Sequence, residues 1–316
     1  MDNADAGGRG LQVAHCYQFS SPPTKSPYSS FVMCFPYLRS LVFIVLLGHA
    51  ALAAQPGSTP VVPKDVIVLY DGKTVNDLRH FYKWLGAHGR DNDPNQVFTI
   101  VDRVDGAPAI RVSGQDWGGI TTRVDYANYK LVLEFRWGSV TWGTRQDRAR
   151  NSGILLHCVG EDGNYKNDFK GNWISSVEYE ILEGRMGDII LVSGFKRGST
   201  EKIIPRLTMT QTTERIWDPN GQPKNFQSGM GHLHWQHWDP EWKDVTNFRG
   251  RRDLDRPLGQ WNTAEAIADG DKLIYYFNGV KVMEGTNVWP TSGRILFQSE
   301  GAEIFFRRIE LHPLRK

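Results

Sequence analysis

The sequence predicts an all-β fold in which two antiparallel sheets pack face to face as a jelly-roll sandwich with long loops. Short segments with strand-like alternation recur along the chain, and turn signals separate them. Helical periodicity is nearly absent. Asn278-Gly279 lies between two apolar segments, which is the pattern of a tight β-hairpin. Many short strands of this kind favour a two-sheet sandwich.

Twelve segments are predicted as strands because their apolar residues alternate with polar ones or run continuously between turns. In chain order they are 66–70, 98–101, 109–112, 119–122, 129–137, 153–159, 176–182, 189–192, 273–277, 280–285, 293–298 and 304–311. Turns are expected at Asp71-Gly72, Asp105-Gly106, Asp269-Gly270 and Asn278-Gly279. One helix is predicted, over 75–84.

The N-terminal region has the pattern of a secretory signal peptide. A basic flank at residues 37–39 precedes an apolar core at 41–47 and small residues at 51–53, and this core is too short to span a bilayer. We expect residues 33–54 to be the signal, with Met33 as the true start and 1–32 as a disordered extension; an unusually long leader is the alternative. No Cys follows the small residues, so we expect an exported, periplasmic or extracellular protein without a membrane anchor.

Residues 60–316 are expected to form one jelly-roll domain, with an insertion at about 196–258. Cys16 and Cys34 precede the expected cleavage point, which leaves Cys158 without a partner for an intramolecular disulfide. The formal net charge is +2 and no basic block occurs, so the sequence lacks the basic surface that is typical of nucleic-acid-binding proteins. The 11 Trp residues serve both cores and sugar-binding surfaces.

Two glutamates on one predicted strand are the first candidate for a site. Side chains alternate along a strand, so Val177, Tyr179 and Ile181 can enter a core while Glu178 and Glu180 share the opposite face about 7 Å apart. A solvated sheet face tolerates two such charges, and a ligand groove uses them. Crowded carboxyl groups raise at least one pKa, as acid catalysis requires.

Other predicted strands also carry polar groups opposite their core side. If these strands are neighbours in one sheet, their polar groups converge on one surface with the two glutamates. The set comprises Glu134, Arg136, Asn151, His157, Gln298 and Glu300, with Trp173 as an aromatic contact for a sugar. The alternative is an ordinary polar outer face, where Arg136 forms surface salt bridges with the glutamates.

A His-x-His motif within the expected insertion is a weak candidate for a metal site. On a strand, His232 and His234 would present both imidazoles on one face, and Asp239 would add an oxygen ligand. A complete ligand set is not present in the sequence. No cofactor is therefore assigned, and a divalent metal remains open; a loop that forms the wall or lid of a groove is the alternative.

The ordered set of motifs resembles the family named for 3-keto-disaccharide hydrolase activity, also described as 3-keto-glucoside lyase and hydratase domains. The resemblance covers nearly all of the mature chain. The matching segments are 69–73, 119–122, Tyr129 with 134–136, 151–154, 178–182, 261–262, 278–279, 293–295 and 306–309. Glu180 stands where Gln is usual, Glu183 where Asp is usual, and His157 where Arg is usual.

The resemblance implies an exported, concanavalin-like jelly roll that acts on a sugar oxidised at C3. Glu178 or Glu180 would remove the C2 proton, Arg136 and His157 would stabilise the enolate, and the other carboxyl would protonate the leaving oxygen. Glu178-x-Glu180-x-x-Glu183 also resembles the Glu-x-Asp-x-x-Glu strand of laminarinase-type glycoside hydrolases, which retain configuration. A third reading is a lectin-like module that binds glycan without chemistry.

Overall fold

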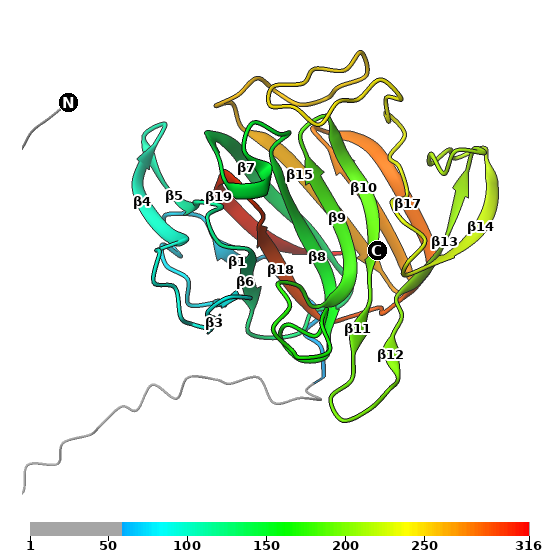
Figure 1. The fold of residues 1–316 in the computed structure, drawn as a ribbon, viewed down its shortest axis with the longest axis horizontal. Coiled ribbons are helices and arrows are strands. Elements are labelled where there is room, and N and C mark those ends of the chain that lie inside the picture. The colour runs from blue at the N-terminus through cyan, green and yellow to red at the C-terminus, as the bar shows by residue number, and fades with distance from the viewer. Residues whose placement is uncertain (1–58, 316) are drawn as a thin grey trace, which may run out of the picture. The chain divides into compact units, whose positions relative to one another are not determined.

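Two antiparallel sheets form the body of the protein in this computed structural model, which describes residues 59–315 (Figure 1). The larger sheet has the order β14-β13-β17-β16-β15-β7-β19-β5-β4, with β1 paired to β19. The smaller, seven-stranded sheet has the order β10-β9-β8-β18-β6-β2-β3. The prediction of a two-sheet sandwich is confirmed. The expected extension and signal peptide lie outside the described residues.

The strands of the larger sheet come from both halves of the chain. They are β1 (Ile67–Tyr70), β4 (Phe98–Val104), β5 (Ala107–Val112), β7 (Tyr129–Thr141), β13 (Arg206–Gln211), β14 (Gln222–Gln227), β15 (Asn262–Asp269), β16 (Lys272–Phe277), β17 (Val280–Trp289) and β19 (Ala302–Pro313). The smaller sheet comprises β2 (Phe81–Leu85), β3 (Gly89–Arg90), β6 (Gly118–Thr122), β8 (Asn151–Val159), β9 (Ser175–Leu182), β10 (Arg185–Val192) and β18 (Arg294–Ser299). A separate ribbon pairs β11 (Gly194–Phe195) with β12 (Lys202–Ile203).

The hydrophobic core lies between the inner faces of the two sheets, as the alternation predicts. Leu131, Leu133 and Phe135 of β7 are fully buried in it. Val177 and Tyr179 of β9 enter the same core from the other sheet. Each such side chain contributes about 1.5–3 kcal/mol through burial. The outer face of every strand is therefore left for polar groups or for a ligand.

The predicted helix at 75–84 is wrong. Residues 81–85 form β2, with Phe81 and Leu85 in the core. Before that strand, the Asp71 carboxylate accepts hydrogen bonds from the backbone N–H of Lys73 at 2.8 Å and of Val75 at 2.9 Å. This carboxylate therefore holds a turn where the helix was expected.

Within residues 59–315 the one helical turn is η1 (Gly143–Arg145). No helix of this region is long and apolar enough to cross a membrane.

Several strands that the sequence did not predict complete the larger sheet. β15 alternates Ala264, Ala266 and Ala268 on its core side, and all three are buried. Alanine is depleted in strands, so the strand propensity of this segment is low and the sequence does not indicate β15. The expected insertion contributes the hairpin of β13 and β14, which extends the sheet beyond β17 at one edge (Figure 1).

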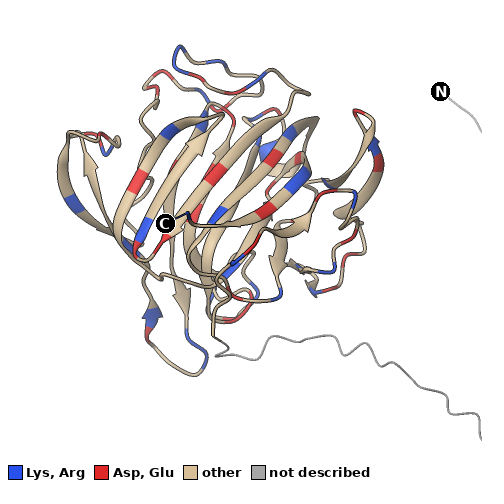
Figure 2. Cartoon of the chain, turned by 180° about the vertical axis from the view of Figure 1, so that it is seen from behind, with Lys and Arg blue, Asp and Glu red and all other residues tan. Residues whose placement is uncertain are grey.

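The outer face of the larger sheet is a ladder of paired charges (Figure 2). Glu134 on β7 contacts Arg307 at 2.6 Å, and Lys130 contacts Glu265 at 2.5 Å. These side chains are partly exposed, and exposed pairs contribute about 0–1 kcal/mol each. This face is thus a solvated surface of the kind that antiparallel sheets present to water.

The Asn278-Gly279 turn joins β16 to β17 and yields the first testable prediction. Both residues have positive φ, 47° and 83°, as a two-residue hairpin turn of type I′ requires. The Asn278 amide also donates to Leu254 O and accepts from Thr263 N. We expect Asn278→Ala to lower the free energy of unfolding by about 2–3 kcal/mol, because it strains the turn and leaves these partners unsatisfied. Urea denaturation measures this change. Asn220→Ala, at an exposed turn, is the control; equal effects of the two variants would contradict the prediction.

Candidate functional site

A groove of about 640 Å³ lies on the outer face of the smaller sheet, over β8, β9, β10 and β18. Its floor is formed by the strands, and its walls come from three loops and the η1 turn. The polar and aromatic lining residues are Arg145, Asn151, Tyr165, Trp173, Glu178, Glu180, Arg185, Ser193, Ser228, His232, Trp242, Asp244, Gln298 and Glu300. The volume lies within the range of about 300–1,000 Å³ typical of small-molecule sites.

Glu178 and Glu180 share the outer face of β9, as predicted. Their neighbours Val177, Tyr179 and Ile181 are held in the core, so the pleat directs both carboxyl groups into the groove. The walls cover this face as well, and the glutamates are only 5% and 3% exposed. Two carboxyl groups therefore lie in a largely water-excluded site.

Gly153 of β8 makes room for the carboxyl groups. It pairs with Glu180 in the sheet, and a Cβ at this position would lie 2.5 Å from Glu178 Oε1 and 2.4 Å from Gln298 Oε1. The missing side chain lets β9 and β18 bring their polar groups together above β8. The Gln298 amide lies beside Glu178 in this space and opposes the rise in the pKa of its carboxyl group.

Three carboxyl groups in the groove have raised pKa values. Burial, reinforced by Glu180 and Glu300, raises the pKa of Glu178 well above its usual range. Burial raises the pKa of Glu180 to about 7, and nearby His232 and Arg185 oppose this rise. Burial and the charge of Glu180 raise the pKa of Glu300 to about 8, against the opposing charge of Arg145. The charge on each of the three carboxyl groups therefore depends on whether its neighbours are protonated.

A cationic cluster lies beside Glu180 in the groove. The Arg185 Nη2 atom donates to Asp188 Oδ2 at 2.5 Å and lies 3.1 Å from His232 Nδ1. His232 Nδ1 is 3.7 Å from Glu180 Oε2. The interaction with Asp188 raises the pKa of His232 despite its burial. Although burial opposes it, the interactions with His232 and His234 and the charge of Arg185 hold the pKa of Asp188 below its usual range.

Several buried polar atoms of the groove have no partner within the described residues. They are Asn151 Oδ1, Glu180 Oε2 and Gln298 Oε1. Buried polar atoms are normally hydrogen-bonded, because leaving one unpaired costs about 1–3 kcal/mol. Unpaired atoms that line a cavity are positions where the hydroxyl groups of a ligand can bind.

Arg136 and Glu134 do not reach this groove, so the predicted convergence is wrong for both. They lie on β7, which belongs to the larger sheet and presents its polar side to the opposite surface of the sandwich. Arg136 Nη1 contacts Asp105 Oδ2 at 2.7 Å. Alternation assigned the correct side of β7, but it does not reveal which sheet a strand joins.

His157 is also misplaced by the sequence prediction. Its φ of 55° and the shifted register after Leu156 mark a bulge in β8, which reverses the alternation. The imidazole is fully buried, its Nδ1–H donates a hydrogen bond at 2.9 Å to Pro290 O, and the ring packs edge-on against Tyr129 in the core. Burial lowers the pKa of His157 to about 4. It faces away from the groove.

The two histidines of the His-x-His motif do lie together, with ring centroids 6.3 Å apart. Asp239 does not join them; its carboxylate instead accepts the backbone N–H of Glu241. Asp188 is the acid beside the two imidazoles, and its Oδ2 lies 3.0 Å from His234 Nδ1. The Arg185 guanidinium contacts this carboxylate and both imidazoles, which leaves a cation at the centre of the group. Among residues 59–315 no group of three or more His, Cys, Asp or Glu is arranged to hold a metal ion.

Glu183, the third carboxyl of the laminarinase-like motif, lies outside the groove. The Arg150 guanidinium donates to Glu183 Oε1 at 2.8 Å, and the Arg150 N–H donates to Oε2 at 3.2 Å. Both side chains are buried. Glu183 therefore anchors the start of β8, and the third carboxyl of the groove is Glu300, just after β18.

Sequence comparison identifies the family. The profile described as the 3-keto-alpha-glucoside-1,2-lyase-like domain matches residues 65–312, which is most of the chain. The chain belongs to this family. No curated protein matches it in sequence.

Among solved structures, one similar chain is a candidate glycosyl hydrolase from Parabacteroides distasonis, 15% identical, with a TM-score of 0.42 and coverage of 81% of this chain and 99% of that one. A second from the same organism is 20% identical, with a TM-score of 0.40 and coverage of 79% and 99%. The carbohydrate-binding module CBM66 from Bacillus subtilis is 10% identical, with a TM-score of 0.33 and coverage of 67% and 91%.

Asn151 and Trp173 both line the groove of this family member. Trp173 packs tilted against Trp117, with ring centroids 6.1 Å apart. An aromatic surface of this kind suits the apolar face of a pyranose ring. Together with Gln298 and Glu300, these residues are brought to the groove as the sequence predicted.

Sequence reasoning missed Arg145, Arg185 and Asp188. Asp188 carried a signal, because it is a charged residue inside the apolar segment 186–192. A bulge between Met186 and Ile189 places it in the interior, fully buried. The two arginines come from a turn and from the start of β10, where no periodic pattern marks them.

The raised carboxyl pKa values predict how stability depends on pH. A carboxyl group whose pKa is higher in the folded state binds more protons when folded, so stability falls as pH rises from about 4.5 through the folded pKa of about 7 to 8. We expect Glu300→Gln to raise the melting temperature at pH 8 by roughly 3–8 °C and to flatten its decline between pH 5 and 8. Thermal unfolding monitored by circular dichroism measures both. Glu214→Gln, at an exposed position, should follow the wild-type curve; a wild-type slope in Glu300→Gln would refute the prediction.

Proposed function

We propose that this protein cleaves 3-keto glycosides in the groove by β-elimination followed by hydration. The observation that supports this proposal is the meeting of three carboxyl groups of raised pKa with the Arg185 and His232 cluster in one covered cavity. Such a set supplies a base, an acid and an anion stabiliser, all of which a single bound sugar can contact. The family match favours a carbohydrate substrate.

Glu180 is assigned as the base. A ketone at C3 acidifies the C2 proton, which a carboxylate can then remove. Of the three carboxyls, Glu180 has a pKa of about 7 and lies beside His232, so it is ionised in a large fraction of molecules at neutral pH. The electron pair of the C2–H bond moves to the C3 oxygen as an enolate.

Arg185 and His232 are assigned to the enolate. The raised pKa of His232 favours the cationic imidazolium, and the guanidinium beside it is always charged. Preorganised cations in a covered site stabilise developing negative charge more strongly than water does. The sequence-based assignment of this role to Arg136 and His157 is replaced, because neither reaches the groove.

Glu300 is assigned as the acid. Its pKa of about 8 keeps it protonated at neutral pH, and it follows β18, which β8 separates from β9 in the sheet. As the enolate collapses, the C1–O bond breaks and Glu300 gives its proton to the leaving oxygen. Water then adds its hydroxyl to C1 and a proton returns to C2, so that the net change is hydrolysis.

A second candidate function is sugar binding without chemistry. Trp173, which lines the groove and packs at a tilt on Trp117, favours it, because aromatic side chains stack on the apolar faces of sugars. Under this alternative, loss of a carboxyl would leave affinity largely intact and no substrate would turn over. Retaining hydrolysis of the laminarinase type has less support, since Glu183 is paired with Arg150 outside the groove.

The test is the cleavage of a 3-keto-disaccharide and of its unoxidised parent by the full chain. We expect cleavage of the oxidised sugar alone, and a fall in kcat of at least 100-fold in Glu180→Gln, because general base catalysis contributes about 10²–10⁴-fold. Product release followed by chromatography measures both. Glu183→Asp, outside the groove, is the control. Wild-type rates in Glu180→Gln would remove it as the base, and binding without turnover in the wild type would support the binding module.

We also propose that the protein is exported to the periplasm or the medium. The basic flank, the apolar core at 41–47 and the small residues at 51–53 support this proposal. Expression with residues 1–58 in a bacterial host should yield a periplasmic chain that starts near residue 55, which N-terminal sequencing detects. An intact chain in the cytoplasm would contradict export.

A further inference from the structure

A second cavity, of about 720 Å³, lies on the same outer face of the smaller sheet as the groove. Alternation along β18 connects the two: Gln298 points into the groove, Leu296 is buried between them, and Arg294 lines the second cavity. At about 3.2–3.4 Å per residue, Arg294 and Gln298 are about 13 Å apart along the strand. Tyr82 and Trp84 of β2 form another wall.

The two cavities are separated by the loop that joins β8 to β9. Its Trp173 packs on a small apolar cluster formed by Leu155, Cys158, Ile174 and Leu296. Tyr165 and Trp173 face the groove, whereas Gly160, Asp162 and Phe169 face the second cavity. A ligand in the second cavity therefore does not contact the groove residues that are assigned to the reaction.

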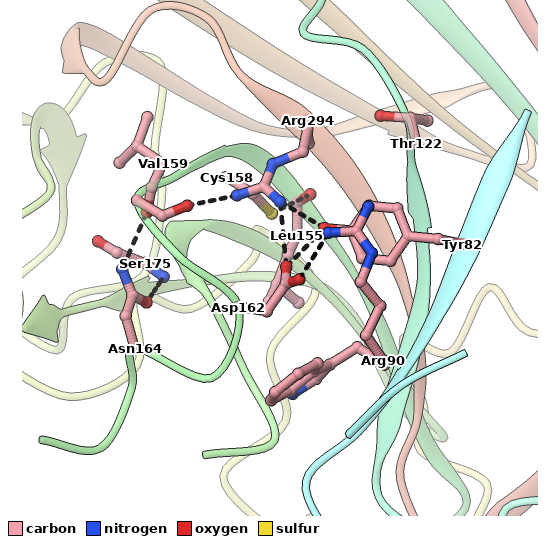
Figure 3. Close-up of polar contacts among 12 residues, drawn as sticks. Tyr82, Arg90, Thr122, Leu155, Cys158, Val159, Asp162, Asn164, Ser175 and Arg294 are labelled. Atoms are coloured by element: carbon pink, nitrogen blue, oxygen red, sulfur yellow. Dashed lines mark hydrogen bonds and ion pairs between the residues drawn. The ribbon is translucent and has the colours of Figure 1, made fainter. Parts of the chain in front are cut away.

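The second cavity has a preorganised cationic wall (Figure 3). The Arg294 guanidinium donates to Asp162 Oδ1 at 3.0 Å and also bonds the Tyr82 hydroxyl and Gly160 O. Arg90 Nη1 donates to Asp162 Oδ2 at 3.1 Å, and its Cζ atom lies over the Tyr82 ring, 3.6 Å from the ring centroid. One carboxylate thus holds two guanidinium groups in place.

Cationic side chains outnumber acidic ones in this cavity. The cations are Arg90, Arg123, Lys196, Arg197 and Arg294, and the acids are Asp125, Glu161 and Asp162. Arg123 bonds within the described residues only through its Nε atom, to Arg79 O at 3.1 Å. Its Nη atoms are therefore free to form the paired hydrogen bonds that guanidinium makes with a carboxylate.

The remaining lining favours a sugar over a bare anion. Trp84, Phe169, Phe195 and Ile203 supply apolar walls, and the volume exceeds what a small inorganic ion needs. Asp125 is half-buried, and its burial raises the pKa of its carboxyl group. Such a group can bond sugar hydroxyls while Arg123 takes up an acidic substituent.

We propose that this cavity is a second carbohydrate site, which binds an acidic sugar through its carboxylate. Arg123 binds the carboxylate, and Arg90 and Arg294 supply the positive field around it. The proposal is independent of the reaction assigned to the groove, because it uses a different set of residues. It also implies that the protein can hold an acidic glycan beside the site where a sugar is cleaved.

Isothermal titration calorimetry of the full chain with digalacturonate tests the proposal, with cellobiose and sodium sulfate as comparison probes. We expect digalacturonate to bind at least tenfold more tightly than either probe. Arg123→Gln should weaken digalacturonate binding 5-fold or more, because it removes one charged pair, and the affinity should fall as salt is raised. Arg103→Gln, which makes the same charge change at an exposed position outside both cavities, should bind as the wild type does.

Glu180→Gln separates this proposal from the reaction assigned to the groove. It should abolish cleavage of a 3-keto-disaccharide and leave digalacturonate affinity unchanged. Arg123→Gln should weaken digalacturonate binding and leave cleavage of the 3-keto-disaccharide unchanged. Four results would each overturn the proposal. They are cellobiose binding as tight as digalacturonate binding, sulfate binding as tight as digalacturonate binding, no heat of binding with digalacturonate, and an unchanged digalacturonate affinity in Arg123→Gln. Loss of digalacturonate binding in Glu180→Gln would place that ligand in the groove instead and would overturn it as well.

Discussion

The site depends on one constraint: β9 is covered on both faces, yet one face carries two glutamates. The core holds Val177, Tyr179 and Ile181, so the pleat cannot turn Glu178 and Glu180 anywhere except toward the groove. The loops above then exclude water from them. Burial of like charges raises their pKa values, and this crowding is what makes proton transfer near neutral pH possible.

The cationic side of the groove limits the destabilisation that such crowding causes. Arg185 and His232 lower the pKa of Glu180, and Arg145 opposes the rise at Glu300. Asp188 in turn orients Arg185 and His234 through bonds of 2.5 Å and 3.0 Å. The buried acid below the groove is thus a positioning group. These cations offset only part of the cost of burying the carboxyl groups. The acidic cluster therefore lowers the stability of the fold, as functional sites often do.

The outer faces of the two sheets differ in what they present to solvent. The larger sheet presents a ladder of paired charges to water and closes the core from behind (Figure 2). The smaller sheet has both cavities on its outer face, one at each end of β18. Loops that enter from β8, β10 and the region after β14 divide this face. A single rigid sheet can therefore hold two sites of different chemistry about 13 Å apart.

Alternation and turn residues in the sequence determined the sandwich, the strand cores, the Asn278-Gly279 hairpin and the outward direction of Glu178, Glu180 and Gln298, because these depend on local geometry. Which sheet each strand joins depends on long-range pairing, and Arg136 was misplaced for that reason. The bulge that turns His157 inward has no local signal. Arg185 and Asp188 join the site only because β10 packs beside β9, so their role became visible only in the tertiary structure.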